Sequence, residues 1–208
     1  MSVSETIVRE FFELQGFLVH QRRKYVSPTA RDDDEIDFFV ANPRPAPARA
    51  VLPFELSPAD LVHLDRAMVV VKGWHTETFS PARLASTPEI FRFVEPASFR
   101  QATRFFGDPA ELTKILIVPA LPQAEDLRAQ SIELLRFRGV DAVIPFRALL
   151  ADLIRRTEIN RNYQKSDLLQ IIRILKNYDF FRESQMELFK TTKRHAARKK
   201  AADPRGKS

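Results

Sequence analysis

The chain has 208 residues, of which 44% are hydrophobic and 29% are charged, so we expect one apolar core with extensions. Cysteine is absent, which excludes disulfides, thiolate metal sites and cysteine nucleophiles and fits a cytoplasmic location. No apolar run approaches the roughly 18 residues needed to span a bilayer, and the first residues lack the pattern of a signal peptide, so no membrane partner is expected.

The formal net charge of +6 is concentrated at the C-terminal end. Residues 190–208 hold eight of the 33 basic residues and one of the 27 acidic residues, so the rest of the chain is close to neutral. A basic segment of this kind attracts phosphate without reading sequence, and it is as often simply a solvated tail. DNA is therefore a candidate partner, and the candidate nucleic-acid-binding residues of the tail are Lys193, Arg194, Arg198, Lys199 and Lys200.

The first 72 residues predict one helix followed by three strands. Apolar residues at helical spacing predict a helix that Ser4 caps and Gly16 ends, after which residues 17–20 are expected to be extended. Residues 35–41 predict a second strand. A Pro-rich connection follows, and the apolar run that ends at residue 71 predicts the third strand.

The rest of the chain alternates helices with short buried strands. The apolar spacing predicts helices at 98–106, 125–138, 147–157 and 166–178, and strands at 113–119 and 140–146. A helix, a three-stranded meander and then helical crossovers predict an α/β fold with a mixed central sheet flanked by helices. The expected organisation is an α/β domain (1–158), a C-terminal helical extension (159–189) and a basic, disordered tail (190–208).

Two polar residues stand at the ends of apolar strands. Asp37 opens one strand and Lys72 closes the next. Side chains alternate along a strand, so Asp37 is expected to share a face with Glu35, and Lys72 with Val70 and Trp74. A strand carboxylate and a neighbouring lysine are the groups that hold a divalent cation beside a phosphodiester: the acid binds the metal, and the lysine positions or activates water and balances phosphate charge.

This arrangement resembles the PD-(D/E)xK nuclease superfamily, most nearly the archaeal-type Holliday junction resolvases. By motif the resemblance covers residues 4–75: Glu5 stands at the family's spacing before the Gly-Phe that opens the first strand, and Asp37 and Lys72 match the family's strand aspartate and lysine. The resemblance implies a restriction-endonuclease-like αβββαβ core. It also implies metal-dependent cleavage of DNA by Glu5, Asp37 and Lys72, with Glu5 and Asp37 as ligands of Mg²⁺ or Mn²⁺.

One ligand of that family is missing. The acid two residues before the lysine falls on Val70. Glu55, His75 and Glu77 are possible substitute ligands if the fold brings them to the same point, and Trp74 is a candidate for stacking on a base. Two functions stay open: an endonuclease-like enzyme with an altered site, or a catalytically inactive nuclease-fold module that binds nucleic acid or a protein partner.

Each candidate residue also has an ordinary structural explanation. Asp37 can end a loop or pair with a basic neighbour, and Lys72 can be an edge residue with its ammonium in water. Glu5 favours the helix dipole in a first turn. Trp74 suits packing and His75 a hydrogen-bonded turn.

A third class of function is an oligomer-forming protein. The helix expected at 166–178 has a broad apolar face that suits either a homodimer interface or packing inside the chain, and Leu168 and Ile172 are the residues whose substitution would separate the two. Dinucleotide binding is disfavoured, because the chain has only five glycines and none of them cluster.

Overall fold

The computed structural model describes residues 2–21, 36–47, 52–107 and 112–181. Glu35 and the basic residues predicted to bind nucleic acid in the tail lie outside this range. The helices are α1 (Val3–Leu14), α2 (Pro81–Ser86), α3 (Pro96–Phe106), α4 (Glu125–Phe137), α5 (Phe146–Arg156) and α6 (Asp167–Asn177). Two 3-10 helices, η1 (Asp60–His63) and η2 (Pro88–Val94), accompany the strands β1 (Leu18–Gln21), β2 (Phe38–Ala41), β3 (Arg66–Val71), β4 (Leu112–Val118) and β5 (Ala142–Pro145).

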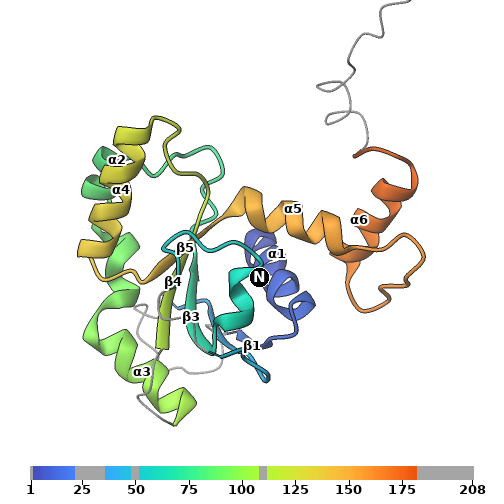
Figure 1. Cartoon of the computed structure of the whole chain (residues 1–208), viewed down its shortest axis with the longest axis horizontal. Coiled ribbons are helices and arrows are strands. Elements are labelled where there is room, and N and C mark those ends of the chain that lie inside the picture. The colour runs from blue at the N-terminus through green and yellow to red at the C-terminus, as the bar shows by residue number, and fades with distance from the viewer. Residues whose placement is uncertain (1, 22–35, 48–51, 108–111, 182–208) are drawn as a thin grey trace, which may run out of the picture.

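The five strands form one mixed sheet in the order β1-β2-β3-β4-β5 (Figure 1). β1, β2 and β3 are an antiparallel meander, whereas β4 is parallel to β3 and β5 is parallel to β4. Glu55 makes an isolated parallel bridge with Val143, so the segment before β3 covers the outer edge of β5. The α/β class and the mixed sheet predicted from the sequence are confirmed.

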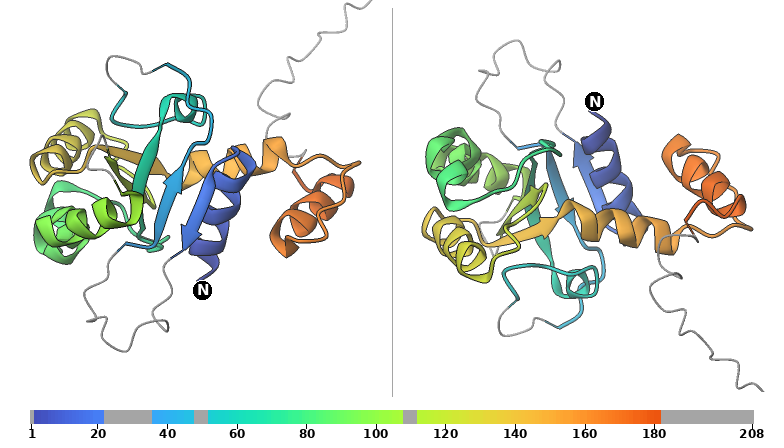
Figure 2. Two further views of the ribbon diagram at one scale, coloured as in Figure 1. Left: turned by 90° about the horizontal axis from the view of Figure 1, so that it is seen from below. Right: turned by 90° about the horizontal axis from the view of Figure 1, so that it is seen from above.

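Helices cover both faces of this sheet (Figure 2). α1, α5 and α6 lie on one face, and α2, α3, α4 and η2 lie on the other. β4 contributes side chains to the cores on both faces of the sheet. Ile115 and Ile117 belong to the core cluster that contains α1, and Leu116 and Val118 belong to the cluster that contains α2 and α4. β4 is therefore buried on both faces, as its continuous apolar run predicted.

Helix α1 begins two residues earlier than predicted. Ser2, not Ser4, is its N-cap: the Ser2 hydroxyl accepts a hydrogen bond from the Glu5 N–H at 3.2 Å and donates to the Glu5 carboxylate at 3.0 Å. The Ser2 hydroxyl thus satisfies one of the free N–H groups of the first helical turn, which is the role of an N-cap serine. Gly16, with a φ of 91°, follows the end of the helix as predicted.

Helix α6 uses part of its apolar face inside the chain. Ser166 caps it as predicted, by accepting a hydrogen bond from the Leu169 N–H. Leu169 and Ile172 then pack into the core cluster that contains α1, and Ile172 is only 6% exposed. Ile172 is therefore a core residue, so at this position the apolar face of the helix is used for packing inside the chain. The outward apolar side chains of the helix and its C-cap are Ile171, Ile174 and Tyr178.

No helix in the described part of the chain is long and apolar enough to cross a membrane.

Glu10 of α1 is partly buried close to the start of α6. Burial raises the pKa of its carboxyl, while a hydrogen bond with Ser166 opposes this shift. The folded state therefore holds the Glu10 proton more tightly than the unfolded chain does. Stability consequently falls as the pH rises from the usual carboxyl pKa through the raised value in the folded protein.

Glu10→Gln removes this pH-dependent loss. We expect the variant to be more stable than wild type at pH 7, and the difference to disappear as the pH falls below the usual carboxyl range. Urea unfolding between pH 4 and 7 measures both effects, with Glu133→Gln on the exposed side of α4 as the control. A Glu10→Gln protein that is less stable than wild type at pH 7 contradicts the burial of this carboxyl.

Candidate functional site

Three segments far apart in the sequence meet at the C-terminal end of β3. They are the first turn of α1, the residue before β2 and the turn after β3. The Ser4 hydroxyl lies 2.8 Å from Nε2 of His75, and the Asp37 carboxylate lies 2.7 Å from the Val71 N–H. This end of the sheet is where the sequence predicted Asp37 and Lys72 to lie.

The Asp37 carboxylate extends the pairing between β2 and β3. The Asp37 N–H donates to the Val69 carbonyl at 3.1 Å, and its Oδ2 accepts from the Val71 N–H at 2.7 Å. The side chain thus takes the place of a main-chain carbonyl at the last residue of β3. As a consequence, a half-buried carboxylate is fixed at the main chain of Val71, the residue that precedes Lys72.

Lys72 continues β3 by one residue. Its N–H donates to the Ile117 carbonyl of β4 at 3.2 Å, so side-chain alternation places Lys72 on the same face as Val70. Val70 is 1% exposed and packs in the core cluster that contains α2 and α4. The position that corresponds to the missing family acid is thus filled by core packing.

Glu5 approaches this end of the sheet from the α1 layer. Its two carboxylate oxygens accept hydrogen bonds from the Ser2 hydroxyl and from Nε2 of Gln21, each at 3.0 Å. Gln21 is the last residue of β1, so this contact ties the start of α1 to the edge strand. Glu5 therefore has a structural role in capping and docking α1.

Ser4, Gly73 and His75 hold the first turn of α1 against the end of β3. A Cβ atom added to Gly73 would lie 2.5 Å from the Ser4 hydroxyl oxygen, so any larger residue requires Ser4 to move. The His75 ring in turn packs edge-on against Phe146, with ring centroids 4.4 Å apart. Ser4 is 9% exposed and pressed against Gly73, a setting that suits a buried contact and not a nucleophile.

Gly73→Ala is expected to lower the free energy of unfolding by about 1–3 kcal/mol, because the new methyl group overlaps Ser4. Ser4→Ala in the same chain removes the closest overlapping atom, so the double variant should lose less than the two single variants combined. Urea unfolding of the three variants measures this coupling. Strictly additive losses would show that Gly73 and Ser4 do not press on each other.

The proposed substitute acids are occupied elsewhere. Glu55 pairs with Arg128 of α4 beside the outer edge of β5, two strands away from β3. Glu77 lies 3.4 Å from Arg83 of α2. The structure therefore brings neither carboxylate to Asp37.

Trp74 forms one side of a small open pocket beside this end of the sheet. Its ring lies 5.8 Å from that of Phe79, and the Arg83 guanidinium lies over it at 5.3 Å. The pocket has a volume of about 450 Å³ and is lined by residues 73–77 and Arg83. A half-buried indole with an arginine over its face suits packing, and it also offers an aromatic surface on which the charge of Arg83 is offset by Glu77.

The described residues do not complete a Mg²⁺ site. Within the described ranges, no three His, Asp or Glu side chains form a group that could hold a metal ion. Asp37 already accepts a main-chain hydrogen bond, and a buried valine fills the position of the second family acid. The acidic residues 32–35 that precede Asp37 lie outside the described part of the chain.

Sequence reasoning identified the end of β3 but missed Ser4 and Gly73 as parts of it. A lone glycine directly after an apolar strand was the available signal, since such a glycine often marks a close approach of another segment. Comparison of the chain with protein-family models, curated proteins and solved structures finds no match, so its function rests on this geometry.

Proposed function

We propose that this chain is a catalytically inactive nuclease-fold module that binds DNA phosphates at the C-terminal end of β3. The element order supports a restriction-endonuclease-like core: one helix, a three-stranded meander and a crossover to parallel β4. That fold assignment is part of the proposal, and the binding site is argued from the residues at the strand end.

The observation that carries the proposal is the burial of Val70. Cleavage of a phosphodiester through Mg²⁺ needs several oxygen ligands around the ion. At the place of one such ligand this chain has an apolar side chain that is 1% exposed, beside an aspartate already bonded to the Val71 N–H. Val70, by packing in the core, and Asp37, by binding the Val71 N–H, both stabilise this end of the sheet.

Binding does not need the missing acid. Lys72 is half-buried at the strand end and supplies a cation, and Arg83 and Trp74 lie beside the turn that follows it. The net charge of +7 over residues 190–208 adds a second, non-specific attraction for phosphate. A nearly neutral folded part with a basic segment is consistent with a contact that salt weakens.

A second candidate is a metal-dependent DNA phosphodiesterase, the activity implied by the family resemblance. It is favoured by the position of the Asp37 carboxylate, which binds the N–H of Val71, the residue before Lys72, at the same strand end. This candidate needs further ligands, and the acidic run at 32–35 is the nearest source in the sequence.

One experiment separates the two. Fluorescein-labelled duplex and branched DNA are incubated with the full chain in Mg²⁺, Mn²⁺ or EDTA, with anisotropy reporting binding and a denaturing gel reporting cleavage. Lys72→Ala tests the cation. Asp37→Asn keeps an oxygen acceptor for the Val71 N–H while removing the charge.

We expect salt-sensitive binding that Lys72→Ala weakens, binding by Asp37→Asn at least as tight as wild type, and DNA of unchanged length. Metal-dependent cleavage that disappears in both variants would establish the second candidate. Absence of binding at low salt would contradict both candidates.

A further inference from the structure

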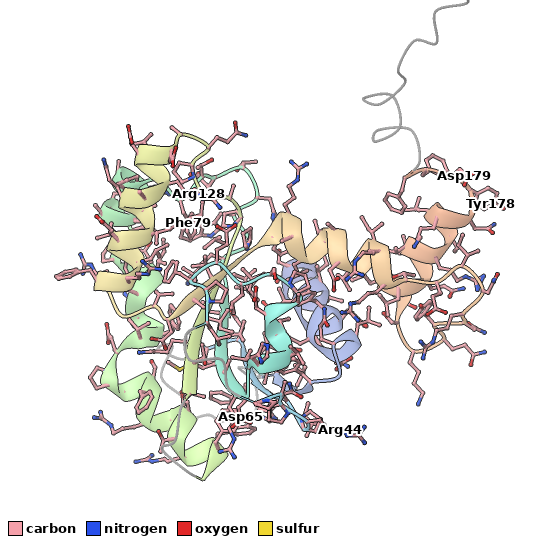
Figure 3. The ribbon with its side chains drawn as sticks, viewed as in Figure 1. Arg44, Asp65, Phe79, Arg128, Tyr178 and Asp179 are labelled. Atoms are coloured by element: carbon pink, nitrogen blue, oxygen red, sulfur yellow. The ribbon has the colours of Figure 1, made fainter. Side chains whose placement is uncertain are left out.

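A second polar pocket lies at the opposite end of the sheet, where β1 begins and β2 ends. It has a volume of about 590 Å³, within the range of about 300–1,000 Å³ typical of small-molecule sites. Figure 3 shows Arg44, which lines this pocket, and Asp65 at the end of the molecule away from Phe79. The pocket is therefore separate from the strand end that carries Lys72.

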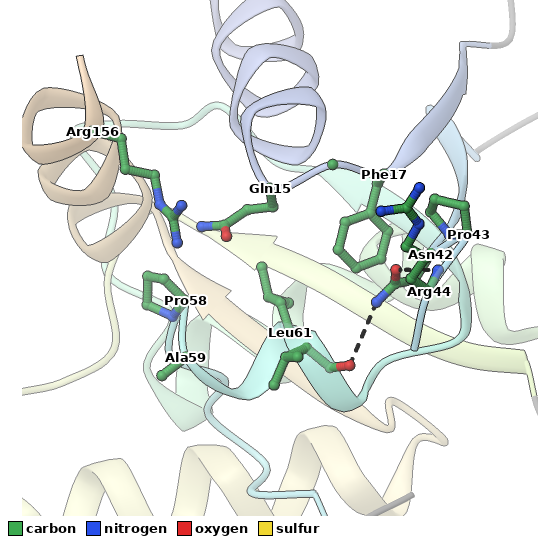
Figure 4. Close-up of a pocket in the computed structure, with 11 residues that line it drawn as sticks. Gln15, Phe17, Asn42, Pro43, Arg44, Pro58, Ala59, Leu61 and Arg156 are labelled. Atoms are coloured by element: carbon green, nitrogen blue, oxygen red, sulfur yellow. Dashed lines mark hydrogen bonds between the residues drawn. The ribbon is translucent and has the colours of Figure 1, made fainter. Parts of the chain in front are cut away.

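Four parts of the chain form this pocket: the end of α1 with the turn that follows it, the loop after β2, the segment around η1, and the last turn of α5. Its lining includes two arginines, Arg44 and Arg156, and no acidic residue. Figure 4 shows these arginines on opposite sides of the pocket, with Phe17 and Leu61 between them. The pocket thus combines two cations with an apolar floor.

Arg156 is held in place by a buried carboxylate. Asp152 is 4% exposed, and its Oδ2 accepts from Nε of Arg156 at 2.9 Å. Gln15 and Arg155 donate to the same carboxylate. Among the described residues, Arg156 makes a hydrogen bond through Nε alone, so its terminal nitrogens are left for a ligand. Because Asp152 is shared by Arg155 and Arg156, one carboxylate faces two guanidinium groups and the local charge stays positive.

Arg44 is presented by a tight turn. Its N–H donates to Oδ1 of Asn42 at 3.0 Å, and Asn42 in turn donates to the Val62 carbonyl at 3.5 Å. Within the part of the chain that the structure describes, the Arg44 guanidinium makes no hydrogen bond or ion pair. An exposed guanidinium that has no partner among the described residues gains most from an oxyanion, which it can bind through two parallel hydrogen bonds.

We propose that this pocket binds a small organic anion, in which a carboxylate or phosphate group is attached to an apolar ring. The oxyanion lies between Arg44 and Arg156, and the ring packs on Pro58, Ala59 and Val62, the more exposed apolar residues of the lining. The amide groups of Gln15 and Asn42 line the same space and add polar contacts at its rim.

Isothermal titration calorimetry with two probes tests the site. Phenyl phosphate and benzoate carry the same ring with different oxyanions, while phenol carries the ring alone and inorganic phosphate carries the anion alone. Arg44→Gln and Arg156→Gln remove one cation each. Arg147→Gln, at the exposed start of α5, is the matched control.

We expect saturable binding of phenyl phosphate or benzoate, weakened about tenfold or more by Arg44→Gln and by Arg156→Gln and unchanged by Arg147→Gln. The tighter of the two probes identifies the oxyanion. Arg44→Gln decides the matter even if Arg156→Gln disturbs folding, because no described residue depends on the Arg44 guanidinium. Failure of both probes to bind at millimolar concentration, equal affinity in Arg44→Gln and Arg147→Gln, or equally tight binding of phenol would each overturn the proposal.

Discussion

Replacing Val70 with glutamate is expected to lower the free energy of unfolding by about 3–5 kcal/mol. Val70 is 1% exposed within an apolar cluster, so the new carboxylate must either be buried with its charge or be protonated. The same substitution restores the acid that the resembled nucleases carry at this position. It therefore tests whether the surrounding site still accepts a metal.

Val69→Glu is the matched control. Val69 is 0% exposed and belongs to the other core cluster, the one that contains α1. Both variants should show similar losses in urea unfolding, and Mg²⁺ should restore neither. A Mg²⁺-dependent gain in stability confined to Val70→Glu would reveal a surviving metal site and favour the phosphodiesterase candidate.

Removal of residues 190–208 is expected to weaken DNA binding by about 100-fold or more at low salt, or about 2.7 kcal/mol. The segment carries eight basic residues and one acidic residue, and each phosphate that it neutralises releases counterions. The dependence of affinity on salt should become shallower by roughly 0.9 for each lost phosphate contact. Anisotropy over a series of KCl concentrations measures both quantities.

Folding should not be affected by this truncation, since α6 ends at Asn177 and its core contacts come from Leu169 and Ile172. Unfolding of the shortened chain checks this point. A control of full length with the eight basic residues changed to glutamine separates charge from chain length. Unchanged affinity and an unchanged salt slope in the truncated protein would place the contact entirely on the folded part.

Strong apolar periodicity predicted most of the fold. α4, α5 and α6 lie within one or two residues of the predicted ranges, because their apolar stripes are long. Gly139 also marks the end of α4, and Ser166 marks the start of α6. Gly16 and Gly139 both adopt a φ of 91° directly after helices, which explains why they mark ends so clearly. Strands β3 and β4 were recognised from their uninterrupted apolar runs.

The segment 81–94 was not resolved into elements from its sequence. It forms α2 and η2, and Pro81 and Pro88 stand at their first positions. Proline is favourable at the start of a helix and disruptive inside one, so closely spaced prolines are compatible both with short helices and with an irregular loop. Phe91 and Phe93 are buried against the sheet, and this packing stabilises the helical form of the segment. Such packing joins parts of the chain that are distant in the sequence, so the local sequence does not predict it.

The sequence predicted which strand ends carry polar side chains, but not how those side chains are used. Antiparallel pairing of β2 with β3 brings Asp37 to the end of β3, as a meander requires. The bond from Asp37 to the Val71 N–H depends on a local departure from regular pairing, and the contact of Ser4 with His75 joins residues 71 positions apart. Neither leaves a short-range pattern in the sequence.

The most direct test of the account is an NMR titration of ¹⁵N-labelled full-length protein with a short duplex DNA in Mg²⁺. We predict saturable shifts of the backbone amides of Lys72, Gly73 and His75, no shift of Gly16 or Asn42 at the far end of the sheet, and DNA of unchanged length after the titration. Shifts confined to residues 190–208, or recovery of shortened DNA, would contradict the claim that the end of β3 binds DNA without cleaving it.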